Sequence, residues 1–225
     1  MMKNLTLADT VAAIVSLLIL TGAAWIAVYG PEAPIPVHFD AAGQANRYGS
    51  RYELAAVLAG LGLLNLLVAW MTGRQAASVA DPVRRKGLQR GQWLSILIMG
   101  AVAVFVAWAS LGPAAATGVS PPGVAMAFTA FILLATGAIL DRVSPNPFIG
   151  VKTPWAYKSR LAWDRSNRLA GRLMFWLGAI GLIASPFVIQ PAGMIALIVG
   201  VLIAALWSVF ESWRVWRADP ERQPF

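Results

Sequence analysis

Six apolar segments alternate with polar stretches along the chain. Each is close to the length that an α-helix needs to cross a bilayer, roughly 17–25 residues. Two of the polar stretches, residues 30–53 and 141–172, are long and rich in proline and glycine. The pattern predicts an all-α, polytopic integral membrane protein with six transmembrane helices. The apolar segments are Leu7–Val28, Leu54–Thr72, Trp93–Leu111, Val124–Leu140, Leu173–Ile189 and Met194–Phe210.

The composition agrees with this class of protein. Of the 225 residues, 58% are hydrophobic and 12% are charged, and the mean hydropathy is +0.66. The charged share is about half of the roughly 25% that is usual in soluble domains. The chain has no cysteine, which excludes disulfides, thiol chemistry and metal sites built on cysteine.

The net charge of +8 is distributed unevenly. Sixteen of the 18 Lys and Arg residues fall on one side of the predicted membrane, and only Arg47 and Arg51 fall on the other. Because cytoplasmic loops carry an excess of basic residues, we expect both termini in the cytoplasm and no nucleic acid partner. The sixteen are Lys3, five residues from Arg74 to Arg90, seven from Arg142 to Arg172, and Arg214, Arg217 and Arg222.

The chain divides into three regions. Residues 1–72 form an N-terminal membrane region with an ordered outer loop, 30–53, and residues 73–140 form a central helix pair. Residues 141–225 hold a cytoplasmic motif, 145–172, and a C-terminal helical hairpin that turns at Gln190–Gly193. We expect 73–92 to be a basic loop on anionic lipid, 113–123 to be a simple connector, and Asn65 to bond a neighbouring helix.

The outer loop predicts a small β-hairpin. Val37–Phe39 and Asn46–Tyr48 can pair across the sequence DAAGQA, with an ion pair between Asp40 and Arg47. His38 is the single histidine, and zinc sites usually need three or four protein ligands. We therefore expect no metal and no cofactor, and a hydrogen-bonded His38 within the loop.

The motif 145–172 predicts a folded loop followed by a helix. Pro145, Pro147 and Pro154 disfavour helix before themselves, and Gly150 supports a turn. Ser159 is the expected N-cap of a helix that runs into the segment beginning at Leu173. Asp164 and Arg168 are spaced for an ion pair within that helix.

The sequence NPFIGVKTPW, followed by a tryptophan and then RLAG, resembles the signature of the SdpI family, bacterial membrane proteins named for immunity to a secreted toxin. Lys152 stands where Arg is expected, and Asn167 stands where His is common. The sequence IPVHFDAAGQANRYGSR resembles an uncharacterised membrane domain that often precedes this signature. The matching residues are Pro36, His38, Phe39, Gly43, Tyr48 and Gly49 in the domain, and Asn146, Pro147, Ile149, Gly150, Thr153, Pro154, Trp155, Trp163, Leu169, Ala170 and Gly171 in the signature.

The resemblance implies an immunity or signal-sensing protein of the bacterial cytoplasmic (inner) membrane. Its partners would be the lipid bilayer, a secreted peptide toxin outside and a regulator inside. A small transporter or channel and a structural membrane scaffold are the alternatives. The chain contains no GxxxxGK[ST], HExxH or GxSxG motif, so we expect no enzyme and no catalytic residue. The candidate toxin- or partner-binding residues are His38, Phe39, Asp40, Gly43, Arg47, Tyr48, Gly49, Asn146, Pro147, Gly150, Lys152, Thr153, Pro154, Trp155, Trp163 and Asn167.

The six predicted helices also divide into two halves of three. Each half has its long loop after its first helix, and both loops carry Pro-x-Pro followed by Tyr-x-Ser-Arg. Because the first half has an odd number of spans, the second half enters the membrane from the opposite side. The arrangement is compatible with a 3+3 inverted repeat, in which binding sites lie between the halves.

Overall fold

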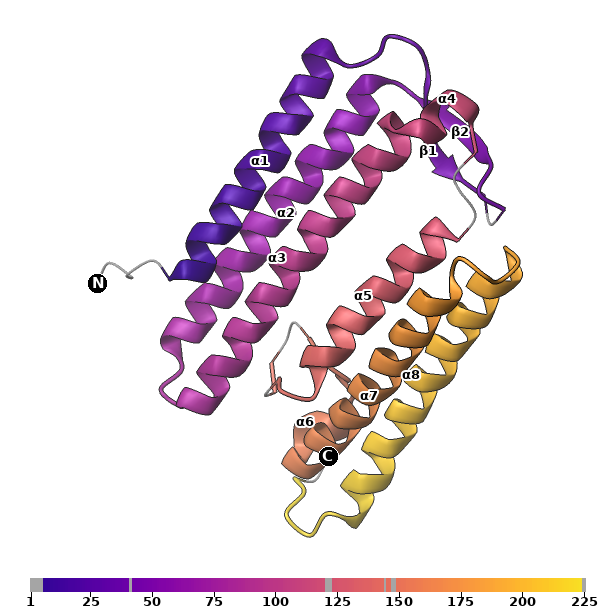
Figure 1. Ribbon diagram of the computed structural model, residues 1–225. Helices are drawn as coiled ribbons and strands as arrows, with labels where there is room; N and C mark the ends of the chain where they lie inside the picture. Colours follow the sequence, from indigo (N-terminus) through magenta and orange to yellow (C-terminus); the bar gives the residue numbers. More distant parts are fainter. Residues whose placement is uncertain (1–5, 41, 120–122, 144, 147–148, 224–225) are drawn as a thin grey trace.

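The computed structural model describes residues 6–40, 42–119, 123–143, 145–146 and 149–223. In these residues the chain forms eight helices and one two-stranded hairpin (Figure 1). The predicted helical architecture is confirmed, and the hairpin adds the predicted small β element. The elements are α1 (Leu7–Tyr29), β1 (Ile35–Phe39), β2 (Ala45–Gly49), α2 (Arg51–Ser78), α3 (Pro82–Leu111), α4 (Pro113–Thr117), α5 (Val124–Leu140), α6 (Pro154–Lys158), α7 (Arg160–Ala184) and α8 (Ala192–Ala218).

Four helices of the described chain, α1, α2, α3 and α8, are long and apolar enough to cross a membrane. Only 22–33% of their most apolar windows is buried inside the protein. Large side chains such as Leu17, Val104 and Leu206 are instead 65–71% exposed. Apolar helix surfaces of this extent are stable in lipid and unstable in water, and the chain is therefore a multi-pass membrane protein.

The other two predicted spans meet the criterion only in part. Helix α5 is apolar but has 17 residues. Helix α7 has 25 residues, but its first half, from Arg160 to Arg172, is strongly charged. That α5 and α7 also cross the membrane, which would give six spans, remains a prediction.

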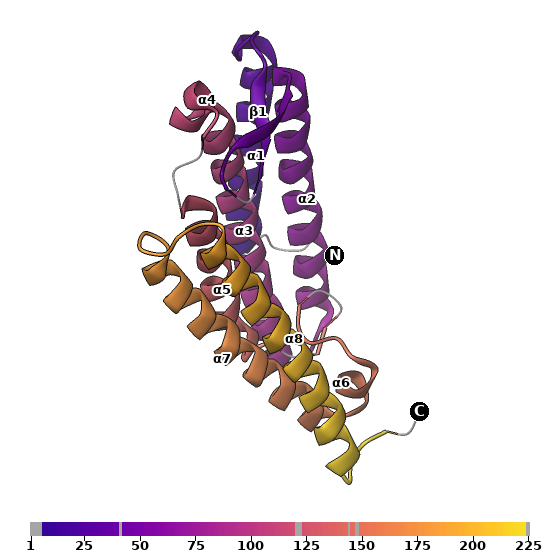
Figure 2. The ribbon, with the colours of Figure 1, turned by 90° about the vertical axis from the view of Figure 1, so that its right-hand side faces the viewer.

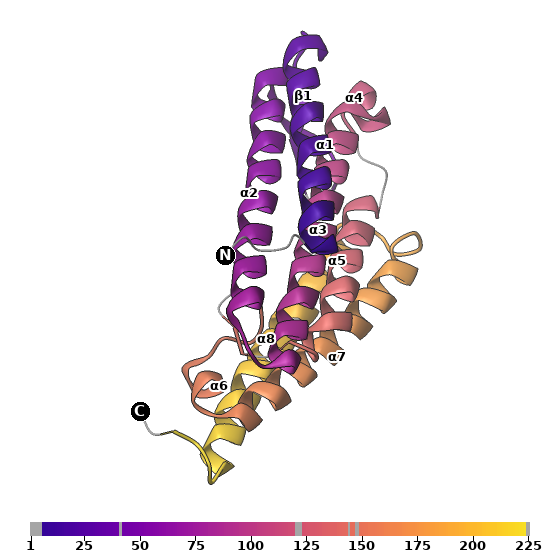
Figure 3. The same cartoon turned by 90° about the vertical axis from the view of Figure 1, so that its left-hand side faces the viewer.

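The helices pack in two groups of three. Helices α1, α2 and α3 lie side by side, and α5, α7 and α8 form a second group that is inclined to the first (Figures 2 and 3). Helix α3 therefore lies with α1 and α2, whereas α5 lies with α7 and α8. The boundaries 1–72, 73–140 and 141–225 and the inverted relation between the halves stay predictions.

The long helices extend beyond the apolar segments. We expected a basic loop over 73–92, but α2 continues to Ser78 and α3 begins at Pro82. That prediction was wrong, because Lys, Arg and Gln favour helix and proline is tolerated in a first turn. The connection is reduced to residues 79–81.

Glycines allow α5 and α7 to approach closely. A Cβ atom on Gly137 would lie 2.6 Å from the carbonyl oxygen of Gly171, and one on Gly178 would lie 2.6 Å from the carbonyl oxygen of Ala130. Both neighbours are backbone atoms, which cannot move aside as a flexible side chain does. Small residues at such contacts are typical of helix pairs in membranes, where close packing drives association.

Polar side chains join the helices of the first group. Asn65 is fully buried, and its Nδ2 donates to Ser16 Oγ at 2.8 Å. The predicted bond from Asn65 to a neighbouring helix is therefore confirmed. Gln92 Nε2 donates to Asp9 Oδ1 at 2.9 Å, and Asp9 also forms a capping box with Thr6 at the start of α1.

The glycine contact predicts the effect of adding one methyl group. Gly178→Ala should lower the free energy of unfolding by about 1–3 kcal/mol, as overpacking of a tight core does. Gly60→Ala is the matched control, since a Cβ atom there meets nothing within 4 Å. Titration of the detergent-solubilised protein with a denaturing detergent measures both, and equal stability of the two variants would contradict the packing.

Candidate functional site

The hairpin covers one end of the molecule. Strands β1 and β2 are antiparallel, with Ile35 opposite Gly49 and His38 opposite Arg47. The register shifts on both sides of His38, which marks a local bulge. His38 Nδ1 and Asn46 Oδ1 form a hydrogen bond of 2.6 Å, so the predicted bonding of His38 inside the loop is confirmed.

Asp40 shapes the turn between the strands. Its Oδ1 accepts hydrogen bonds of 2.9 Å from the amides of Ala42 and Gln44. Gly43 has a φ of +81°, a conformation that glycine adopts without steric cost. The predicted pair of Asp40 with Arg47 was wrong, because Asp40 is engaged by the turn and Arg47 pairs with Glu53 at 2.7 Å.

The segment after α3 is a partner of the hairpin. The amide of Ala45 donates to the carbonyl oxygen of Gly118 at 2.7 Å, and Gln44 forms an isolated β-bridge with Val119. The prediction of a simple connector over 113–123 was therefore wrong. The segment ties the hairpin to the end of α3.

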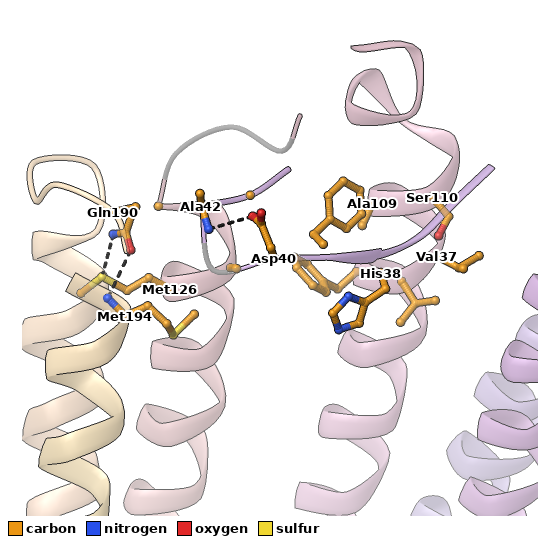
Figure 4. A pocket seen from close by; sticks show the side chains of 15 residues that line it. Val37, His38, Asp40, Ala42, Ala109, Ser110, Met126, Gln190 and Met194 are labelled. Atoms are coloured by element: carbon orange, nitrogen blue, oxygen red, sulfur yellow. Dashed lines mark hydrogen bonds between the residues drawn. The ribbon is translucent and has the colours of Figure 1, made fainter. Parts of the chain in front are cut away.

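A pocket of about 310 Å³ lies beneath the hairpin, where α3, α5 and the start of α8 converge (Figure 4). Its lining is mainly apolar. It includes Met126 and Met194, whose flexible side chains make the pocket adaptable in shape. Pockets of this size with a few polar groups are typical ligand sites. The lining residues are Val37, His38, Phe39, Asp40, Ala42, Gly43, Phe105, Val106, Ala109, Ser110, Gly123, Ala125, Met126, Gln190 and Met194.

Gln190 is the polar group that joins two sides of this pocket. Its Nε2 lies 3.2 Å from the sulfur of Met126, and its Oε1 accepts from the amide of Met194 at 3.2 Å (Figure 4). Phe105 of α3 stacks on Phe128 of α5, with ring centroids 4.1 Å apart. The aromatic stack connects the two groups of helices beside the pocket, whereas the contacts of Gln190 join α5 to α8 within the second group.

A second folded structure lies at the opposite end of the molecule. We call it the basic-end knot, a name that refers to its hydrogen-bonded loop and not to a topological knot. It comprises residues 143, 145–146, 149–167, 212 and 219. Its centre is Trp163, which is fully buried and donates from Nε1 to the carbonyl oxygen of Val143 at 2.8 Å. Asn167 accepts from the amide of Val151 at 2.8 Å and donates to the carbonyl oxygen of Trp163 at 2.9 Å. The loop is thus fixed to the first turns of α7.

Gly150 is required by this packing. Its φ is +133°, and a Cβ atom there would lie 2.8 Å from Asn167 Oδ1 and 2.9 Å from the Trp163 ring. Asn146 stabilises the turn before Gly150, because its side chain forms two hydrogen bonds with the backbone of Ile149, at 2.9 and 3.0 Å.

The knot also holds the end of α8. Thr153 and Ser212 share a hydrogen bond of 2.7 Å between their hydroxyls, and Ser159 donates to Asp219 Oδ2. Ser159 accepts from the amide of Ala162 at 2.9 Å, which confirms it as the N-cap of α7. The predicted pair of Asp164 with Arg168 was wrong, because Asp164 pairs with Arg160 one turn earlier, at 3.3 Å.

The candidate residues thus lie at two opposite ends and do not form one site (Figure 1). His38, Phe39, Asp40 and Gly43 line the pocket, whereas Arg47, Tyr48 and Gly49 lie on the second strand outside its lining. Asn146, Gly150, Thr153, Trp163 and Asn167 form the knot, and Lys152, Pro154 and Trp155 lie at its surface. Pro147 lies outside the described residues.

Sequence reasoning missed most of the pocket. Phe105, Met126, Gln190 and Met194 come from different helices, and their spacing in the chain gave no signal. The available hint was Gln190, a polar residue at the turn between two apolar segments. Among the described residues there is no group of three or more His, Cys, Asp or Glu that could hold a metal ion.

The helices, the hairpin and the knot define a multi-pass α-helical membrane protein with one elaborate loop structure at each end. Residues 142–212, which contain all of the knot except Asp219, match the SdpI/YfhL protein family. Residues 17–63, which contain the hairpin, match a domain of unknown function (DUF1648). The resemblance of both regions is therefore confirmed, and at the level of the family it supports a membrane protein of the immunity type. Comparison with curated proteins and with solved structures gave no match.

The Ser159–Asp219 contact predicts a pH dependence of stability. The hydrogen bond from Ser159, with a second from the amide of Glu221, lowers the pKa of the Asp219 carboxyl, against the opposing effect of burial. A lowered pKa in the folded state stabilises the protein above the ordinary Asp value of about 3.9. That contribution is lost as the pH falls through the lower folded-state pKa.

We expect the temperature of half-unfolding in detergent to decrease as the pH is lowered below about 4. This decrease should be less steep in Asp219→Asn. Asp164→Asn, which removes a carboxylate from the surface of α7, should retain the wild-type profile. Identical profiles for wild type and Asp219→Asn would contradict the role of this contact.

Proposed function

We propose that this protein is a six-span immunity and sensor protein of the bacterial cytoplasmic membrane, and that it binds an apolar part of a secreted peptide toxin in the pocket under the hairpin. The pocket is the observation that carries the proposal. It is mainly apolar, its size suits one or two large side chains, and its polar groups are few. Capture of the peptide there would keep it from acting on the bilayer.

The orientation follows from the charge of the two ends. The hairpin end carries Arg47 and Arg51, whereas the knot end carries the dense basic segments from Arg74 to Arg90 and from Arg142 to Arg172. The positive-inside rule then assigns the pocket to the outside and the knot and both termini to the cytoplasm. We take α5 and α7 as the remaining two spans, because α7 packs along α8 and α5 packs along α7 (Figure 1).

The knot supplies the proposed intracellular contact. Its buried residues hold the loop in one conformation, so that exposed Lys152 and Tyr157 and half-buried Trp155 form a defined surface. A cytoplasmic regulator would read this surface. The contact of Thr153 with Ser212 and that of Ser159 with Asp219 join the knot to α8, whose other end lines the pocket.

The orientation can be tested by cysteine labelling, since the native chain has no cysteine. Ser50 and Ser159 are unsuitable positions because both are helix N-caps. Ala33 at the hairpin end and Ala80 at the knot end are exposed and outside the helices. Ala33→Cys should react with a membrane-impermeant maleimide in intact cells and Ala80→Cys only after lysis, and the opposite pattern would refute the orientation.

The pocket can be tested by filling it. In a deletion strain challenged with candidate toxins, Ala109→Phe should reduce protection, because the ring would occupy the space beneath the hairpin. Ala138→Phe adds the same ring at an exposed position on α5 and should protect as the wild type does. Protection is compared at equal membrane abundance.

Equal protection by both variants would contradict the pocket as the toxin site. Solute uptake is measured in the same strains. Loss of uptake in Ala109→Phe, with protection unchanged, would favour a small transporter instead.

A further inference from the structure

A second concave surface lies between α7 and α8 near the knot. We call it the arginine groove. Its volume is about 450 Å³ and it is distinct from the pocket under the hairpin. The groove is lined by Arg165, Arg168, Leu169, Arg172, Trp207 and Glu211.

Three arginines follow one face of α7. Arg165, Arg168 and Arg172 are spaced by three and four residues, so they lie above one another and cover about 10 Å of helix length. All three are exposed. Like charges at this spacing destabilise a helix, unless an anion lies between them.

The acids nearby are engaged elsewhere. In the described part of the chain, Asp164 pairs with Arg160 at 3.3 Å. Glu211 lines the groove, but Arg214 donates to both of its oxygens at 2.8 Å. No acidic side chain among the described residues pairs with the three groove arginines, and the groove lining holds three positive charges against the one negative charge of Glu211.

The groove ends at an apolar surface. Beyond Arg172, the next residues on that face of α7 are Trp176 and Ile180, each 62% exposed. On α8, Ile203 and Trp207 are 56% and 58% exposed. A ligand that fills the whole surface would therefore have a negative head beside the arginines and apolar chains along the two helices.

We propose that the arginine groove binds the phosphate of an anionic phospholipid, with the acyl chains against α7 and α8. Guanidinium groups match phosphate oxygens with paired hydrogen bonds, which an ammonium group does not provide. Trp207 lines the groove with the arginines, and tryptophan is enriched at the level of lipid headgroups. The lipid would neutralise the arginines and join α7 to α8 at the level of the knot.

The test uses the full-length purified protein in detergent and fluorescent phosphatidylglycerol. Removal of one basic residue near a membrane surface weakens binding of an anionic lipid about fivefold, so Arg168→Gln/Arg172→Gln should weaken it about 25-fold. Arg142→Gln/Arg160→Gln is the matched control: it also removes two charges near the knot, but these two arginines lie outside the groove lining and pair with Asp141 and Asp164, so it should bind as the wild type does. Arg168→Lys/Arg172→Lys should bind with intermediate affinity.

Three competitors identify the ligand. Phosphatidylglycerol should displace the probe, whereas phosphatidylcholine and inorganic phosphate should not. Equal loss of binding in both Gln double variants would overturn the proposal, because the attraction would then be general. Displacement by inorganic phosphate at the same concentration would also overturn it, since the groove would bind a free anion. A melting curve of each variant without lipid verifies that it is folded.

Discussion

The close contact of α5 with α7 is the constraint on which the second half of the structure depends. In a bilayer, apolar side chains gain little from leaving lipid, so helices associate through tight packing. Gly137 and Gly178 provide that packing, because any side chain at these positions would meet backbone atoms. The contact fixes the end of α5 that lines the pocket. It also fixes the first turns of α7, on which both the knot and the arginine groove are built.

The hairpin and the knot, at opposite ends of the molecule, both contain backbone groups that are hydrogen-bonded within the loop structure. A folded loop near a membrane has backbone groups that need partners. At the hairpin end these partners are Asp40, which accepts from two amides, and Gly118, which accepts from Ala45. At the knot end they are Asn146 and Asn167. At both ends, therefore, neutral or acidic side chains order the backbone of the loop.

The sequence predicted the local elements well, because their causes are local. Ser159 is the N-cap of α7, and β1 and β2 pair across the turn sequence DAAGQA as predicted. Contacts between side chains that are brought together only by the packing of the helices could not be predicted from the sequence. Asp164 had two arginines in reach and pairs with Arg160, and Arg47 pairs with Glu53 on the following helix. The pocket requires α3, α5 and α8 to converge, which no single stretch of sequence specifies.

The central claim is that the toxin is bound in the pocket between the two helix groups, and cross-linking tests it most directly. A photoreactive benzoylphenylalanine is placed at Phe105, which lines the pocket, or at Val104, the neighbouring residue, which is 71% exposed on the outer surface of α3. The cells are illuminated with a toxin against which the protein protects. We predict a covalent adduct with the toxin from position 105 and none from position 104. Equal adducts from both positions, or none from 105 in cells that remain protected, would contradict this account.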